Sequence, residues 1–143
     1  VFPIAGGVFP RAAERGVPDV LGKGSRMIYI VDDDDAVRDS LRALFESCDF
    51  EVRDFASGAA FLTESLDSLQ GCLILDLHLP VVGGFEVLSR VRAIRPFDLP
   101  IIVITGRGDE ATGQRLLKAG ADADMEKPVD AVALVATATD LMQ

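Results

Sequence analysis

Hydrophobic and polar positions alternate between two patterns along residues 27–143. Short apolar runs bounded by polar or turn residues predict buried strands, and longer stretches with apolar residues three or four positions apart predict helices. The five predicted strands are Met27–Val31, Glu51–Phe55, Leu73–Leu75, Ile101–Ile104 and Ala123–Glu126. A helix is predicted after each strand, the fourth over about Asp109–Ala119 and the last over Val129–Met142.

Capping residues mark where several of these helices begin and end. Asp34 or Asp35 is placed to cap the first helix, and Gly120 closes the fourth. The second helix, capped by Ser57, is expected to carry three apolar residues, Phe61, Leu62 and Leu66.

The alternation of strands and helices predicts an α/β fold with a doubly wound parallel sheet and helices on both faces. Right-handed crossovers bring the carboxyl ends of all five strands to one edge, where ligands bind in open α/β sheets. We therefore expect five residues that lie far apart in the sequence to meet at this edge: Asp32, Asp33, Asp76, Thr105 and Lys127.

This set of side chains indicates phosphoryl chemistry. Three converging carboxylates repel one another unless a cation lies among them, and hard oxygen ligands with few protein donors suit Mg²⁺. A carboxylate beside a metal can accept a phosphoryl group, while the Thr105 hydroxyl and the Lys127 ammonium can bind phosphoryl oxygens. Taken alone, the run of four aspartates is typical of a solvated turn, and Lys127 of an ordinary surface lysine.

Composition and charge narrow the classes of function. Residues 1–26, rich in Pro and Gly and without a sustained period, are interpreted as an irregular N-terminal extension or leader, and residues 27–143 as one domain. That domain carries 10 basic and 21 acidic residues, a net charge of −11, which disfavours nucleic-acid binding and suits a metal or a basic partner. The lack of a long apolar run or secretory signal predicts a cytoplasmic protein that does not enter membranes.

Four ordered segments resemble the receiver domains of two-component response regulators, close to the nitrogen-fixation regulator type. They are Ile30–Arg38 (IVDDDDAVR), Leu75–Pro80 (LDLHLP), Ile102–Asp109 (IVITGRGD), and Lys118–Ala121 (KAGA) with Glu126–Pro128 (EKP). The resemblance covers about residues 27–143. It implies a flavodoxin-like (βα)5 sheet with strand order 2-1-3-4-5, and phosphorylation by a histidine kinase or phosphotransfer protein.

The resemblance also implies a role for each site residue. Asp76 would be the phosphoacceptor, and Mg²⁺ would be held by Asp33 and Asp76 directly, by Asp32 through water and by the backbone carbonyl of His78. Thr105 would be the switch hydroxyl and Lys127 the phosphate-binding ammonium. A cis peptide before Pro128 would aim the lysine.

One departure from the family concerns how the signal is read out. Family members usually carry Tyr or Phe three residues before the lysine, but here that position is Asp124, and Val129 replaces the usual Phe after Lys-Pro. We expect the face formed by the fourth helix, fifth strand and fifth helix to remain the signalling surface, for a downstream protein or a homodimer. It would respond by loop and charge rearrangement because Asp124 is unsuited to burial.

Two other classes of function are weighed against a phosphorylated receiver. A pseudo-receiver would bind proteins without phosphorylation, which the acid pocket argues against and Asp124 favours. An aspartyl phosphatase would need a second carboxylate two residues after the nucleophile, where His78 stands, so we expect no enzyme acting on an external substrate. Only 16 residues follow Lys127, so output is expected through a protein partner or from a longer regulator of which this chain is a part.

Overall fold

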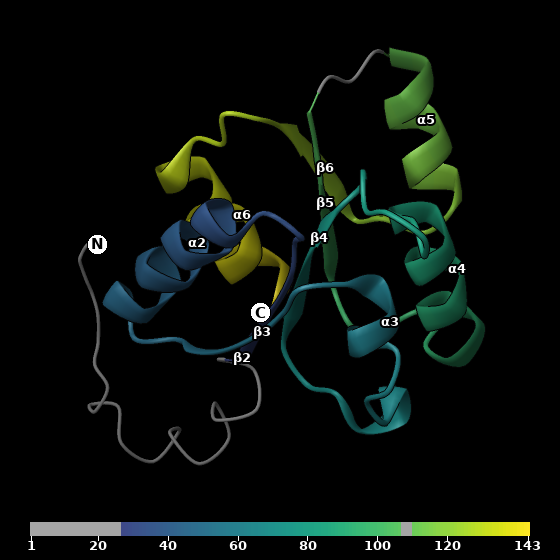
Figure 1. Ribbon diagram of the computed structural model, residues 1–143, viewed down its shortest axis with the longest axis horizontal. Helices are drawn as coiled ribbons and strands as arrows, with labels where there is room; N and C mark the ends of the chain where they lie inside the picture. Colours follow the sequence, from purple (N-terminus) through teal and green to yellow (C-terminus); the bar gives the residue numbers. More distant parts are fainter. Residues whose placement is uncertain (1–26, 107–109) are drawn as a thin grey trace.

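A computed structural model describes residues 27–106 and 110–143. The expected N-terminal extension, residues 1–26, and the expected helix start at Asp109 lie outside the described residues. Five strands form one parallel sheet in the order β3-β2-β4-β5-β6 (Figure 1). Counted along the chain this is the order 2-1-3-4-5, which confirms the predicted flavodoxin-like fold.

The strands agree closely with the predicted runs. They are β2 (Met27–Val31), β3 (Glu51–Phe55), β4 (Cys72–Asp76), β5 (Ile101–Thr105) and β6 (Ala123–Glu126). All five residues of β4 and of β5 are buried. These continuous apolar runs are therefore explained by a position at the centre of a sheet that is covered on both faces.

Helices cover both faces of the sheet, as Figure 1 shows. On one face lie α2 (Asp35–Ser47) and α6 (Ala131–Leu141), and on the other α3 (Gly58–Phe61), α4 (Gly84–Ile94) and α5 (Glu110–Lys118). Each face has its own hydrophobic core, with Phe45 and Leu134 buried on the first and Leu88 and Leu116 on the second. The sheet is thus fixed by burial from both sides.

The predicted second helix is wrong in its length. Ser57 caps α3 as expected, accepting a hydrogen bond from the Ala60 amide at 3.0 Å, but the helix ends at Phe61. The Thr63 hydroxyl then donates to the Ala60 carbonyl at 2.7 Å and competes with continued helical bonding. Leu66 is buried in a separate 3-10 turn, Leu66–Ser68, so the apolar spacing marks core residues without a continuous helix.

The other helix ends follow the expected capping chemistry. The Asp34 carboxylate accepts from the amides of Ala36 and Val37 and caps α2. Gly120 follows α5 with φ of +110°, a left-handed conformation that favours glycine. The last helix begins at Ala131 and not at Val129, because the Asp130 carboxylate caps it by accepting from the Ala133 amide.

Candidate functional site

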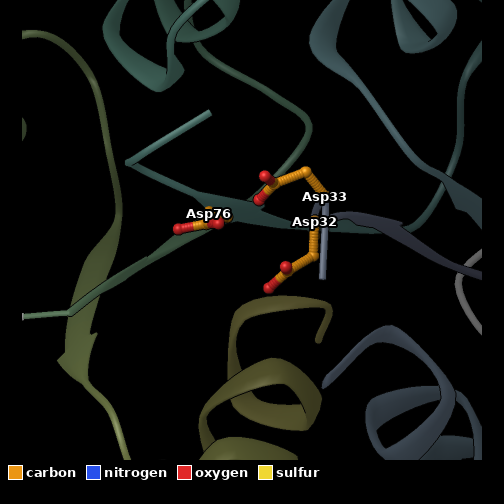
Figure 2. A group of neighbouring side chains, drawn as sticks. All are labelled: Asp32, Asp33 and Asp76. Atoms are coloured by element: carbon orange, nitrogen blue, oxygen red, sulfur yellow. The ribbon is translucent and has the colours of Figure 1, made fainter. Parts of the chain in front are cut away.

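The register of the sheet brings the predicted acids together. Val31 pairs with Leu75 across β2 and β4, so Asp32, the next residue, lies level with Asp76. Figure 2 shows the side chains of Asp32, Asp33 and Asp76 as neighbours at the ends of two adjacent strands. Carboxylate oxygens from the three residues lie within 4.8 Å of one another. Topology therefore produces this cluster from the ends of two neighbouring strands, although Asp32 and Asp76 are 44 residues apart in the sequence.

The burial of the three acids differs. Asp32 and Asp76 are 2% and 4% exposed, whereas Asp33 faces solvent. The Asp76 Oδ1 atom accepts a hydrogen bond from the His78 amide at 3.1 Å, and the Asp32 Oδ1 atom accepts from the Asp34 amide at 2.9 Å. Backbone amides thus orient the buried carboxylates of Asp32 and Asp76, and the solvent-exposed carboxylate of Asp33 completes the cluster.

Lys127 supplies the positive charge of the site. Its Nζ atom lies 3.6 Å from Asp32 Oδ2 and 3.8 Å from Asp76 Oδ2. The Lys127 amide donates to the Thr105 carbonyl at 2.8 Å, which fixes the start of the loop after β6, and the Lys127–Pro128 peptide bond is cis. One ammonium between two carboxylates leaves the cluster with excess negative charge, which fits a divalent cation with oxygen ligands.

The Thr105 hydroxyl is the one buried side-chain polar atom without a hydrogen-bond partner among the described residues. Thr105 is 1% exposed and follows Ile104, which pairs with Asp76 in the sheet. A buried hydroxyl without a partner is costly, so such groups are rare in folded proteins. Thr105 thus places an unused hydroxyl donor at the same edge of the sheet as Asp76.

Asp124 lies on β6 but its side chain is exposed. A Cβ atom placed on Gly113 of α5 would lie 3.4 Å from Asp124 Oδ2, so the carboxylate occupies the surface next to this helix. The structure therefore places Asp124 outside the acid cluster, on the surface between α5 and β6.

Arg38 is not among the site residues predicted from the sequence, but it reaches residues 32–34, the loop between β2 and α2 that is called the acid loop below. Its Nη1 atom donates to the Asp32 carbonyl oxygen at 2.8 Å, and its Nη2 atom bonds Asp35 Oδ1 at 2.6 Å. The spacing of Asp35 and Arg38 on a helix was the available signal for half of this arrangement. The contact with the Asp32 carbonyl depends on how the loop turns into α2, which no spacing reveals.

Burial raises the pKa of the Asp32 carboxyl, and repulsion from Asp76 and Asp33 acts in the same direction. The hydrogen bond from the Asp34 amide and the charge of Lys127 lower the pKa but do not cancel the rise. A carboxyl with a higher pKa in the folded state binds more protons there than in the unfolded state. Without metal, its contribution to the free energy of unfolding therefore falls as pH rises from its unfolded pKa through its folded pKa.

An Asp32→Asn variant should therefore melt at a higher temperature than the wild type in EDTA near pH 7. This gain should shrink as pH is lowered toward about 4, where the unfolded carboxyl also takes up its proton. Circular dichroism melting curves at a series of pH values measure the difference. A gain that does not change with pH, or no gain, would contradict the assignment of this cost to the Asp32 charge.

Comparisons with known proteins agree with this geometry. Residues 28–139 match the response regulator receiver domain family. The chain is 38% identical over 109 residues to the transcriptional regulatory protein FixJ of Azorhizobium caulinodans, covering 76% of this chain and 51% of that protein. FixJ of Bradyrhizobium diazoefficiens is 41% identical over 105 residues, covering 72% and 50%.

Solved structures lead to the same family. Full-length FixJ from B. japonicum superimposes with a TM-score of 0.72 at 37% identity, covering 81% of this chain and 57% of that one. The chain thus spans about half the length of the curated relatives it matches. None of the described helices is long and apolar enough to cross a membrane. With its 2-1-3-4-5 parallel sheet and its pocket of Asp32, Asp33, Asp76 and Lys127, this chain belongs to the response regulator receiver domain family, a signalling module.

Proposed function

We propose that this receiver domain accepts a phosphoryl group on Asp76 in a two-component phosphorelay. The observation that carries the proposal is the surrounding of Asp76: a buried carboxylate with the Lys127 ammonium at 3.8 Å and a partnerless Thr105 hydroxyl on the neighbouring strand. The Lys127 ammonium and the Thr105 hydroxyl can each bind a phosphoryl oxygen. The buried Asp76 carboxylate and the buried, unpaired Thr105 hydroxyl both cost stability, so stability alone does not explain their presence at this edge.

Mg²⁺ is the metal that fits the donor set. Asp33 and Asp76 would be its direct carboxylate ligands, Asp32 would act through water, and the His78 carbonyl would supply a further oxygen. The metal would neutralise charge on the phosphoryl oxygens during transfer. The raised pKa of Asp32 supports a cation site. Burial and the neighbouring acids destabilise the charged form of this carboxyl, and a nearby cation would stabilise it.

The transfer is a displacement at phosphorus. A carboxylate oxygen of Asp76 forms the new bond while the bond between phosphorus and the imidazole nitrogen of a phosphohistidine donor breaks, and the released imidazole takes up a proton from solvent. Lys127 binds one phosphoryl oxygen, exchanging part of its present contact with the two acids for the new dianion. The Thr105 hydroxyl donates to another oxygen once the group is in place.

Phosphorylation adds a charge of about −1.5 to −2 to the site and shifts an existing equilibrium between two arrangements of the loops. We place the readout on the surface of α5, β6 and α6. Asp124 stands on this surface where family members usually have an aromatic ring, and its exposed carboxylate cannot bury itself as a ring does. The response is therefore a rearrangement of loops and charges on this surface.

The role of Asp124 can be tested with a phosphoryl mimic. Wild-type α5 and β6 should change their backbone hydrogen exchange when beryllofluoride and Mg²⁺ are added, and Asp124→Phe should alter the size of that change by introducing a ring. Asp124→Asn, which removes the charge without adding a ring, separates the two effects. Identical changes in all three proteins would rule out a part for Asp124 in the readout.

The expected partners follow from charge and family. A histidine kinase or phosphotransfer protein would supply the phosphoryl group in the cytoplasm, and a downstream protein or a second copy would bind the α5–β6–α6 surface. With a net charge of −11 over residues 27–143, the domain suits a basic protein surface and is not expected to bind nucleic acid directly.

Treatment with acetyl phosphate tests the proposed function. In the presence of Mg²⁺ the intact protein should gain about 80 Da, the mass of one phosphoryl group, and the adduct should be lost on brief exposure to alkali. The same incubation with EDTA should give little or no adduct. A wild-type protein that gains no mass with Mg²⁺ would instead support a pseudo-receiver that works without phosphorylation.

A further inference from the structure

Arg38 joins the acid loop to the helix that follows it. Its Nη1 atom donates to the backbone carbonyl of Asp32 at 2.8 Å, and its Nη2 atom bonds Asp35 Oδ1 at 2.6 Å. The loop in turn holds the helix, because the Asp34 carboxylate accepts from the first amides of α2. A side chain of the helix thus holds the loop backbone, and a side chain of the loop holds the helix backbone.

This arrangement differs from an ordinary surface ion pair three residues apart on a helix. In such a pair both side chains remain in solvent and contribute little. Here the Arg38 side chain is only 15% exposed, whereas that of Asp35 is 85% exposed. The guanidinium therefore lies folded against the acid loop, and its bond to the Asp32 carbonyl determines its position.

The Asp32 carbonyl belongs to the peptide unit that also contains the Asp33 amide. Because a peptide unit is planar, a hydrogen bond to this oxygen orients the whole unit and with it the backbone from which the Asp33 side chain extends. Within residues 27–106 and 110–143, no hydrogen bond or ion pair is found for the Asp33 carboxylate itself. Its direction is therefore set by its backbone, between Asp32 and Asp34, which are both held by hydrogen bonds.

We propose that Arg38 is a positioning residue for the metal site: its two-point bond to Asp32 and Asp35 fixes the peptide between Asp32 and Asp33 and so aims the Asp33 carboxylate. The inference rests on the proposed function, because it requires that Asp33 bind Mg²⁺. Groups that orient metal ligands from outside the coordination sphere typically contribute 10- to 100-fold to metal affinity.

The guanidinium also has an electrostatic effect, which acts in the opposite direction. A fixed positive charge near the acids repels a divalent cation, so charge alone predicts that removing Arg38 would tighten Mg²⁺ binding. Positioning predicts weaker binding. Arg38→Lys separates the two effects, because lysine keeps the charge but lacks the planar fork that bonds two oxygens at once.

Isothermal titration of metal-free protein with Mg²⁺ tests the proposal. Arg38→Lys and Arg38→Gln should both raise the dissociation constant by about 10-fold. The matched control is Arg42→Gln, one turn further along α2, which loses ion pairs to Glu46 and Asp54 at 3.1 Å but does not reach the acid loop. It should leave Mg²⁺ affinity unchanged even if it lowers the melting temperature.

The outcomes are distinct. If Arg38→Lys binds like the wild type and Arg38→Gln binds more tightly, Arg38 acts only through its charge and the positioning role is overturned. Unchanged affinity in both variants overturns it as well. If Arg38→Gln loses the helical circular dichroism signal, the comparison of Arg38→Lys with the wild type decides alone. A wild type that binds no Mg²⁺ would refute the metal site of the proposed function, whereas normal wild-type binding with unaffected Arg38 variants refutes this inference alone.

Discussion

An Asp76→Asn variant should gain no phosphoryl group from acetyl phosphate while remaining fully folded. The amide lacks the nucleophilic carboxylate oxygen, so the loss should be complete within the limit of intact-mass detection. Folding should be retained because the Asn side chain has nearly the same shape and keeps an oxygen for the hydrogen bond from the His78 amide, which is 3.1 Å long in the wild type.

The same variant should be more stable than the wild type when no metal is present. Asp76 is 4% exposed and lies in a cluster of three carboxylates, so removing its charge relieves repulsion that also raises the pKa of Asp32. A gain of about 1 kcal/mol would raise the melting temperature in EDTA by about 4 °C. A lower melting temperature would mean that the bond to Lys127 outweighs the repulsion, and would contradict this account of the pocket.

An Arg92→Ala variant should lose about 3 kcal/mol of folding free energy, the largest stability effect that we expect from one side chain on the surface of α4. The Arg92 side chain is 12% exposed and donates to four backbone carbonyls and one carboxylate, those of Gly120, Arg95, Asp98, Leu99 and Asp122. These bonds hold together the end of α4, the loop before β5 and the turn after α5. Without the guanidinium, several carbonyls lose their donor at once.

Chemical denaturation monitored by circular dichroism measures this loss. The matched control is Arg90→Ala on the same helix, whose side chain is 57% exposed and makes one long ion pair with Glu86 at 3.8 Å. That variant should stay within about 0.5 kcal/mol of the wild type. Because Arg92 lies at the amino edge of the sheet, phosphorylation of Arg92→Ala by acetyl phosphate should persist under conditions where the protein is folded. Equal stabilities of the two variants would contradict the role given to Arg92.

The fold was predictable because its strands are encoded locally. The runs at β4 and β5 are apolar up to their last residue, since both strands are covered on both faces, and the helices between the strands force a parallel sheet. Once the sheet is parallel, Asp32, Asp76, Thr105 and Lys127 must come to one edge. The acid cluster therefore follows from topology and the positions of a few charges.

Features that depend on tertiary contacts were not predictable in the same way. The helix expected through Leu66 ends at Phe61, and the Thr63 hydroxyl in the following turn donates to the backbone carbonyl of Ala60. Phe61 and Leu66 are both buried in the core without a continuous helix between them. The five hydrogen-bond partners of Arg92 come from three separate segments, which no local sequence pattern reveals. Arg38 pairs with Asp35 at a recognisable spacing, yet its bond to the Asp32 carbonyl appears only in three dimensions.

The exposed position of Asp124 sharpens the question of readout. The sequence predicts that this carboxylate is unsuited to burial, and it is exposed beside Gly113 of α5. A phosphoryl group on Asp76 would add negative charge to a domain that already has 21 acidic and 10 basic residues in 27–143. Repulsion between that group and neighbouring acidic residues would therefore drive the proposed charge rearrangement.

Identification of the phosphorylated residue tests the central claim most directly. After acetyl phosphate and Mg²⁺ treatment, borohydride reduction converts an aspartyl phosphate into homoserine, and peptide mass spectrometry locates the converted residue. We predict homoserine at position 76 and at no other aspartate. Homoserine at position 32 or 33, or an unmodified residue 76 in protein that has gained the phosphoryl mass, would contradict the assignment of Asp76 as the phosphoacceptor.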